Sequence, residues 1–110
     1  MDEKFITALK VTSRDKWLTE RIGRVGDSIF THPNYLYLKG NKELIDEWIA
    51  YLKRPEGYRR KILDNLVEDI KKNGQLESIV IDKEMRILNG HKRTSVMAFL
   101  GHEKIKVKYQ

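Results

Sequence analysis

Residues 88–100 read LNGHKRTSVMAFL, which combines the end of a strand, an Asn-Gly turn and the start of a helix. The strand is expected to end at Leu88 and the helix to begin near His91. The first N–H groups of a helix lack intrahelical partners, and the helix dipole favours an anion at that end. Lys92 and Arg93 oppose this dipole, which suggests that they serve a ligand. The stretch therefore predicts a phosphate site.

Two interpretations of this turn remain open. In the first, Gly90 lets the backbone approach a phosphate without a Cβ in the way. The turn then supplies the phosphate-binding residues Asn89, Gly90, His91, Lys92, Arg93 and Thr94. In the second, the same residues form a solvated loop that caps the helix, and the basic side chains point into water.

The segments around this turn carry clear periodic patterns. Helices are expected over 41–53, capped by Asn41 and ended by Pro55, and over 57–73, ended by Gly74. Residues 78–82 and 86–88 are typical of two strands joined by a turn. Residues 105–110 alternate apolar residues with lysines, as in a half-buried strand of the kind found at sheet edges. Lys108 on that strand is expected to add only long-range attraction to an anion at the turn.

The N-terminal part is less regular. Residues 5–11 suggest a strand, and residues 13–23 a short helix with Ser13 as its N-cap. Residues 23–40 lack a sustained period and are interpreted as a long loop. The order of elements predicts one small α/β or α+β domain over 1–110, with a mixed sheet and a loop-helix insertion at about 23–55.

The composition indicates which kinds of partner the protein could bind and in which compartment it is expected. The 110 residues carry a net charge of +6, with basic residues concentrated at 53–61 and after residue 85, which favours a nucleic acid or a nucleotide. No apolar run could span a membrane and no secretory signal is recognisable, so a cytoplasmic protein is expected. Cysteine is absent, and the three histidines His32, His91 and His102 lack metal-site spacing, so no metal site is expected.

Residues 63–110, LDNLVEDIKKNGQLESIVIDKEMRILNGHKRTSVMAFLGHEKIKVKYQ, resemble the ParB-like and sulfiredoxin-like superfamily. The similar features are a helix ending in Asn-Gly, the strand SIVI, a short hairpin, the Gly-His-Lys-Arg turn, a helix with FLG and a last basic-apolar strand. The resemblance implies a domain that holds phosphates of DNA or a nucleotide, with Lys92 and Arg93 as contacts and His91 nearby. Members include CTP-binding partition proteins, nucleases, sulfiredoxin and small-molecule kinases.

At several positions this sequence departs from the family pattern, which reduces the number of family activities expected for it. Sulfiredoxin chemistry requires a cysteine in the turn, and this chain has none. The turn also differs from the Gly-Glu-Arg-Arg of partition proteins, and Asn89 replaces the aspartate of kinase-like members. The main expectation is therefore phosphate binding. An enzyme alternative, a phosphotransferase, NTPase or nuclease using a nucleotide with magnesium, would employ His91 as acid or base and Glu56 as its assistant.

Two further expectations concern the insertion. His32 and Tyr35 are candidates for a lid over the phosphate site, where they would stack on a base or donate hydrogen bonds to it. A third functional alternative is an accessory protein that binds other proteins through the helix carrying Trp48 and Tyr51.

Overall fold

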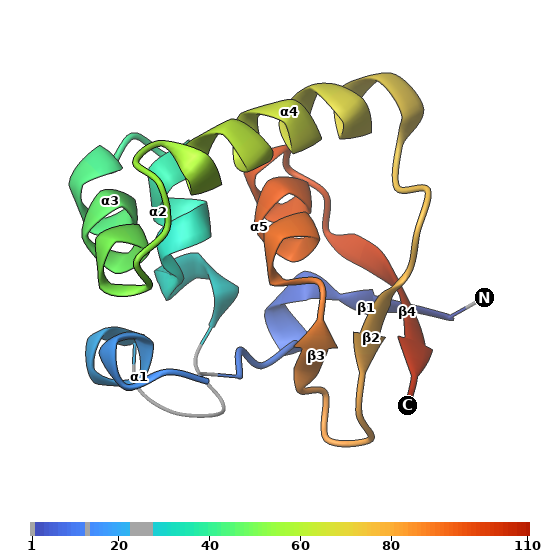
Figure 1. Ribbon diagram of the computed structural model, residues 1–110. Coiled ribbons are helices and arrows are strands. Elements are labelled where there is room, and N and C mark those ends of the chain that lie inside the picture. The colour runs from blue at the N-terminus through green and yellow to red at the C-terminus, as the bar shows by residue number, and fades with distance from the viewer. Residues whose placement is uncertain (1, 13, 23–27) are drawn as a thin grey trace.

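Four strands form one sheet in the order β1-β4-β2-β3 (Figure 1). Its strands are β1 (Asp2–Phe5), β2 (Ile79–Ile81), β3 (Ile87–Asn89) and β4 (Lys104–Tyr109). β2 runs parallel to β4, whereas the pairs β1·β4 and β2·β3 are antiparallel. The predicted mixed sheet is thus confirmed, and the chain is a small α+β domain. The computed structural model describes residues 2–12, 14–22 and 28–110, without the side chain of residue 22.

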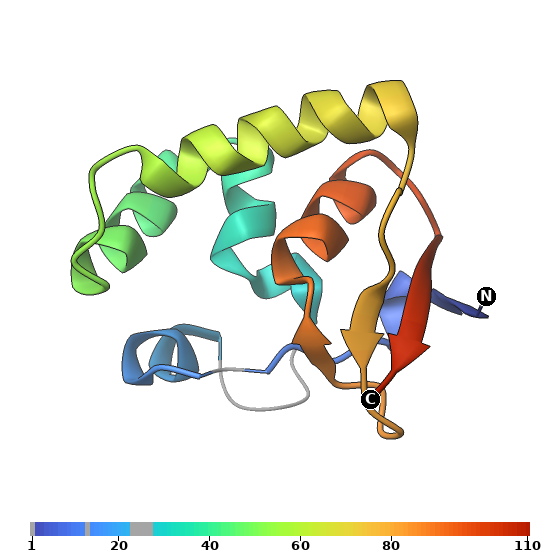
Figure 2. The same cartoon turned by 45° about the vertical axis from the view of Figure 1, so that its right-hand side comes forward.

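The helices pack against one another, mainly around the short helix that follows His32. They are α1 (Lys16–Ile22), α2 (Pro33–Leu38), α3 (Lys42–Tyr51), α4 (Tyr58–Asn73) and α5 (His91–Phe99). α4 extends from α3, past α2 and α5, toward the sheet (Figures 1 and 2). Among the described residues, no helix is both long and apolar enough to cross a membrane.

The core lies between the sheet and these helices. Ile79, Ile81 and Ile87 of the β2–β3 pair are almost completely buried, together with Ile105 and Val107 of β4. The helices contribute further buried residues, of which the main ones are Leu63, Val67, Ile70, Val96, Met97, Ile45, Trp48 and Ile49. Burial of these side chains supplies the main stabilisation and fixes the start of α5 against β2.

The chain from Asn41 onward follows its sequence pattern closely. Asn41 caps α3 by accepting a hydrogen bond from the Leu44 N–H at 3.1 Å, and Gly74 ends α4 with φ of 72°. α3 ends at Tyr51, earlier than Pro55 suggested, because Lys53 adopts a left-handed conformation. The strands over 78–82 and 86–88 and the helix after the Asn-Gly turn are confirmed.

The last strand is half-buried as predicted, but it is not an edge strand. Ile105 and Val107 face the core while Lys104, Lys106 and Lys108 are exposed. The expectation of an edge was wrong because β1 pairs with the other side of β4. Alternation alone shows which face of a strand is buried, but it does not show how many neighbours the strand has.

The strand predicted over residues 5–11 lies earlier in the chain, at Asp2–Phe5. β1 ends at Phe5, and Ile6–Ala8 form a short 3-10 helix, so that Ile6, Leu9 and Val11 reach the core at mixed spacing. Lys10 then pairs with Arg86 in an isolated parallel bridge beside β3. Ser13 and Gly23, the expected ends of the next helix, lie outside the described residues. Asp15 accepts a hydrogen bond from the Leu18 N–H at 2.7 Å at the start of α1.

The predicted loop over 23–40 was wrong in its described part. Residues Ile29–Thr31 form a 3-10 helix, and α2 follows directly. His32 caps α2 because its Nδ1 accepts a hydrogen bond from the Asn34 N–H at 3.0 Å, and Pro33 occupies the first helical position. Histidine is an uncommon N-cap, so the sequence pattern did not reveal this helix. Residues 23–27 lie outside the described part.

Candidate functional site

A cleft of about 1090 Å³ opens beside the start of α5. Its described lining comes from one face of α4, from the Asn-Gly turn, from the segment before α1 and from the start of α2. Trp48 of α3, Val80 of β2 and the C-terminal Gln110 complete it. The lining includes Thr12, Arg14, Asp15, His32, Asn34, Trp48, Arg59, Ile62, Leu66, Asp69 and residues 89–93. The cleft is thus built from segments far apart in the sequence, and the turn contributes only one of its walls.

The turn presents the start of α5 to this cleft. Asn89, Gly90, His91, Lys92 and Arg93 all line it. Within the described part of the chain no side chain caps α5, so the first N–H groups of the helix lack the usual capping acceptor. An anion in the cleft could accept hydrogen bonds from these groups.

The structure does not bring Thr94 into the cleft. Its side chain is fully buried, and its hydroxyl donates a hydrogen bond to the Gly90 carbonyl at 2.8 Å. Thr94 therefore holds the first turn of α5 together from inside, and its hydroxyl is not directed at a ligand.

Gly90 is required by packing within the domain. Its φ is 121°, and a Cβ at this position would lie 2.4 Å from the Ile79 Cγ2 atom. The sequence suggested that the missing Cβ makes room for a ligand, but it makes room for β2. Close packing of the turn on Ile79 is what aims the start of α5 at the cleft.

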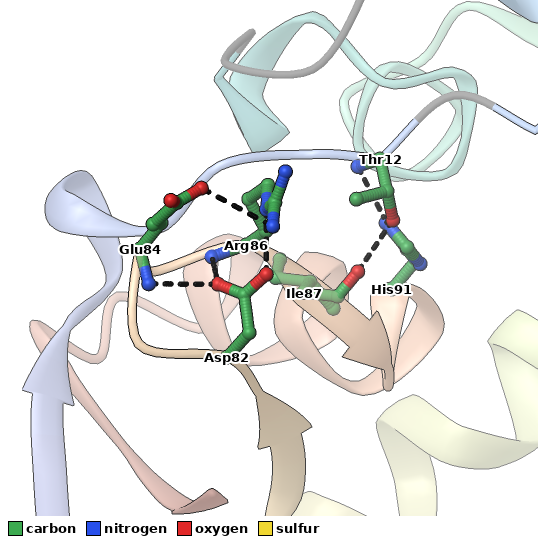
Figure 3. A network of polar contacts seen from close by, with 6 residues as sticks. All are labelled: Thr12, Asp82, Glu84, Arg86, Ile87 and His91. Atoms are coloured by element: carbon green, nitrogen blue, oxygen red, sulfur yellow. Dashed lines mark hydrogen bonds and ion pairs between the residues drawn. The ribbon is translucent and has the colours of Figure 1, made fainter. Parts of the chain in front are cut away.

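His91 fixes the N-terminal segment to the turn (Figure 3). The Thr12 N–H donates a hydrogen bond to His91 Nε2 at 3.2 Å, and the Thr12 hydroxyl donates one to the Ile87 carbonyl. Burial, together with the charges of Arg14, Lys92 and Arg59, lowers the pKa of His91 to about 4. His91 is therefore neutral at pH 7, with Nε2 occupied as an acceptor.

His32 forms a wall of the cleft and not a mobile lid. Its side chain is 2% exposed, stacks on His91 with ring centroids 5.6 Å apart and meets Trp48 edge-on at 5.4 Å. Burial holds the pKa of His32 well below its usual value, and the charges of His91, Arg59 and Lys92 act in the same direction. Two neutral imidazoles thus lie stacked on each other in the lining that they share with the cationic groups.

The two remaining predicted residues lie outside the cleft lining. Tyr35 packs edge-on against Phe30 with centroids 5.0 Å apart. Glu56 is exposed in the turn before α4 and does not line the cleft. The structure therefore does not bring Glu56 together with His91, although the enzyme alternative requires both.

Of the residues that the structure describes, four with cationic side chains line the cleft, namely Arg14, Arg59, Lys92 and Arg93. Burial lowers the pKa of Lys92, and repulsion from Arg59 and Arg93 lowers it further. Burial also lowers the pKa of Arg59, whose guanidinium stacks on Trp48 at 4.8 Å. The cations are thus held close enough to repel one another, which an anion between them would relieve.

The carboxylates around the cleft are largely engaged elsewhere. Asp15 accepts hydrogen bonds from the Leu18 N–H and from Trp48 Nε1, the latter at 3.1 Å. Asp69 accepts one from Asn73 at 3.0 Å. Arg93 lies 3.8 Å from the exposed Glu77, which makes a loose ion pair. The positive charge of the cleft is therefore only partly balanced by the described acids.

Three N–H donors of the cleft residues are buried without a hydrogen-bond partner in the described structure. They are Asn34 Nδ2, Arg59 Nε and Arg93 Nε. Asn34 is fully buried, and its Oδ1 accepts a hydrogen bond from Arg59 Nη1 at 3.4 Å, which leaves the amide nitrogen as the free end. A fourth such atom, Arg60 Nε, lies outside the cleft and 3.0 Å from an Asp46 carboxylate oxygen. Buried donors without a partner lower the stability of the fold. A ligand with several hydrogen-bond acceptors would satisfy these three.

Sequence reasoning missed Arg14, Asn34 and Arg59 as site residues. Arg59 carried a usable signal, because a basic residue in the first turn of α4 opposes the helix dipole as Arg93 does in α5. Arg14 donates a hydrogen bond to the Leu88 carbonyl at 2.6 Å, but nothing in its local sequence marks this contact. Asn34 could not be found without recognising α2.

The magnesium expected for the enzyme alternative has little to bind it. The described residues contain no group of three His, Cys, Asp or Glu side chains that could hold a metal ion. Asp15 and Asp69 line the cleft, but each already accepts a hydrogen bond from a neighbour. Cationic donors, and not oxygen ligands, dominate the described walls.

Comparisons with known proteins find no match: no family model fits the sequence, and no curated protein or solved structure shows significant similarity.

Proposed function

We propose that this chain is a ParB-like domain that binds phosphate groups of a nucleotide or nucleic acid in the cleft at the start of α5. The observation that carries the proposal is the set of unpaired buried donors on Asn34, Arg59 and Arg93. All three are N–H groups, and a phosphate offers several acceptor oxygens to such donors.

Electrostatics support the same ligand class. Arg14, Arg59, Lys92 and Arg93 surround the cleft, and the uncapped start of α5 adds the partial positive charge of the helix dipole. A phosphate there would restore the pKa of Lys92 toward its ordinary value, because it would offset the repulsion from Arg59 and Arg93. Charge, donors and helix position thus favour one kind of ligand.

Binding is favoured over catalysis by the position of His91 and Glu56. His91 Nε2 already accepts the Thr12 N–H, and Glu56 does not line the cleft. The proposal therefore gives His91 a positioning role: it ties residue 12 to the start of α5. Incubation with ATP, ADP or CTP and magnesium, or with supercoiled plasmid, would reveal turnover and overturn this choice.

Replacing Arg93 tests the proposed site directly. Arg93→Ala removes a charge-assisted donor of about 1.5 to 3 kcal/mol, so affinity for phosphate ligands should fall about ten- to a hundredfold. Fluorescence anisotropy at low salt, with a labelled single strand, a duplex, CTP and ATP, measures the change. If no ligand binds with a Kd below about 1 mM at low salt, the proposal is refuted, since electrostatic attraction is strongest at low salt.

Arg21→Ala is the matched control. It removes the same charge from a side chain that pairs with Glu47 and stacks on Trp17, away from the cleft lining. Arg21→Ala should lower the affinity for phosphate ligands by a factor of less than about three, because an exposed charge adds mainly salt-screened attraction. Equal losses in both variants would indicate diffuse attraction. Melting curves should stay close to wild type, because the Arg93–Glu77 pair is loose and largely exposed on the Glu77 side.

A further inference from the structure

The outer face of β4 carries a row of three lysines, Lys104, Lys106 and Lys108, called here the lysine row. All three are exposed, whereas the intervening Ile105 and Val107 face the core. Side chains at every second position of a strand lie about 6.5 to 7 Å apart along one face. The lysine row is thus a regular line of positive charge on the uncovered side of an interior strand.

The lysine row leads into the cleft. Lys108 is paired with Val80 across the parallel β2·β4 ladder, and Val80 lines the cleft. Gln110, which directly follows β4, lines it too. The two strands run side by side in Figure 2. The sequence suggested that Lys108 was remote from the turn; in the sheet Lys108 does not itself line the cleft, but it is paired with a residue that does.

The neighbours of the lysine row include one facing acid and one aromatic ring. Glu3 of β1 lies opposite Lys106, and Phe5 lies opposite Lys104. Lys106 Nζ also donates a hydrogen bond to the Gln75 carbonyl at 3.4 Å. Phe5 is 53% exposed, and the Lys104 ammonium lies 4.9 Å from its ring centre. The face is therefore net positive and carries an exposed ring on which a base could stack.

We propose that the lysine row is a docking track for single-stranded nucleic acid, whose backbone runs along β4 and whose nearest phosphate enters the cleft. This inference rests on the proposed phosphate site and extends it to a partner class. The charge complementarity is specific to a polyanion with a regular repeat, because the lysines are evenly spaced and continuous with the cationic cleft.

A flexible strand fits this surface better than a duplex. The cleft donors are recessed: Asn34 is fully buried and the Arg93 side chain is 24% exposed. A single strand can turn a phosphate into the cleft while the rest follows the lysine row. A duplex holds its phosphates on a stiff rod, which cannot reach recessed donors without deformation.

The test compares two triple variants of the full chain with equal loss of charge. The first is Lys104→Gln, Lys106→Gln and Lys108→Gln. The control is Lys39→Gln, Lys42→Gln and Lys71→Gln, whose exposed side chains do not line the cleft. Anisotropy with a labelled 20-nucleotide strand of mixed sequence is measured over a series of salt concentrations, and a labelled trinucleotide serves as the probe for the cleft alone.

Loss of three phosphate contacts should flatten the plot of log affinity against log salt by about 2, since each contact on a single strand contributes about 0.7. At low salt the first variant should bind the 20-mer at least tenfold more weakly, while the control keeps the wild-type slope. Both variants should bind the trinucleotide like wild type, whereas Arg93→Ala should not. Melting curves for each variant show that the fold is intact.

The possible failures are distinguishable. If wild type does not bind the trinucleotide and Arg93→Ala changes nothing, the phosphate site itself is wrong. If the trinucleotide binds but the first variant keeps the 20-mer affinity and slope, the lysine-row proposal alone is wrong. A duplex that binds as tightly as the single strand would overturn the assignment to single strands.

Phe5→Leu separates a nucleic acid from other polyanions. It keeps an apolar side chain but removes the ring, so affinity for the 20-mer should fall about fivefold or more while heparin binding stays unchanged. Unchanged affinity for the 20-mer, or heparin binding as tight as that of the strand, would indicate recognition of any polyanion and overturn the proposal.

Discussion

Gly90→Ala is expected to destabilise the domain by about 3 to 5 kcal/mol, a large part of the total stability of a small domain. The new Cβ would lie 2.4 Å from Ile79 Cγ2 and 2.7 Å from Ile79 Cβ, in a residue with φ of 121°. The clash costs about 1 to 3 kcal/mol, and the backbone strain adds a similar amount. Urea denaturation at pH 7 measures the loss.

Gly40→Ala provides the matched control. Gly40 has a similar φ of 111°, but nothing lies within 4 Å of its hypothetical Cβ. The backbone strain alone should therefore cost about 1 to 2 kcal/mol. The difference between the two variants isolates the contact with Ile79. If Gly90→Ala and Gly40→Ala lose the same stability, the turn does not pack on β2 as described.

Acidification is expected to destabilise the domain by about 2 to 3 kcal/mol between pH 6.5 and about pH 4. Burial and nearby cations lower the folded-state pKa of His91 from 6.5 to about 4, whereas the unfolded chain titrates near 6.5. In this window the unfolded state binds more protons than the folded state, so stability falls as the pH falls. The buried His32 acts in the same direction. Urea midpoints measured from pH 7.5 to 4.5 follow the effect.

Two single variants identify which histidine causes this loss of stability at low pH. His91→Gln should flatten the dependence, because its side chain does not titrate and can still accept a hydrogen bond. His102→Gln, a change at an exposed residue, should leave the dependence as in wild type. A wild-type midpoint that stays constant from pH 7 to 5 would contradict the burial of these two rings as neutral groups.

Local signals were sufficient for most of the chain from Asn41 onward. Asn41 and Gly74 mark helix ends through side-chain capping and a left-handed stop, and Lys104 to Tyr109 alternate as a half-buried strand must. Pairing partners were not predictable in this way. The position of β4 inside the sheet depends on β1, whose residues carry no apolar pattern.

The candidate site was predicted only where it is local in sequence. The helix start after Gly90 was visible because dipole and charge conflict at Lys92 and Arg93. The opposite walls of the cleft could not be predicted from the sequence, since Arg14, Asn34 and Arg59 reach the cleft only through tertiary packing. His32 was singled out for the wrong reason: a capping bond through Nδ1 and burial against Trp48 make it part of the frame.

The pairing of β1 with β4 also has a consequence for how the domain folds. Residues 2–5 must find residues 104–107, so this contact closes nearly the whole chain. Closing so long a loop is entropically unfavourable until other contacts shorten it, and such non-local pairing slows folding. We expect α4, β2, β3 and α5 to assemble first, because they are consecutive in sequence. During synthesis, β1 can pair only after residues 104–107 have left the ribosome, so we expect this pairing to be among the last contacts of the sheet to form.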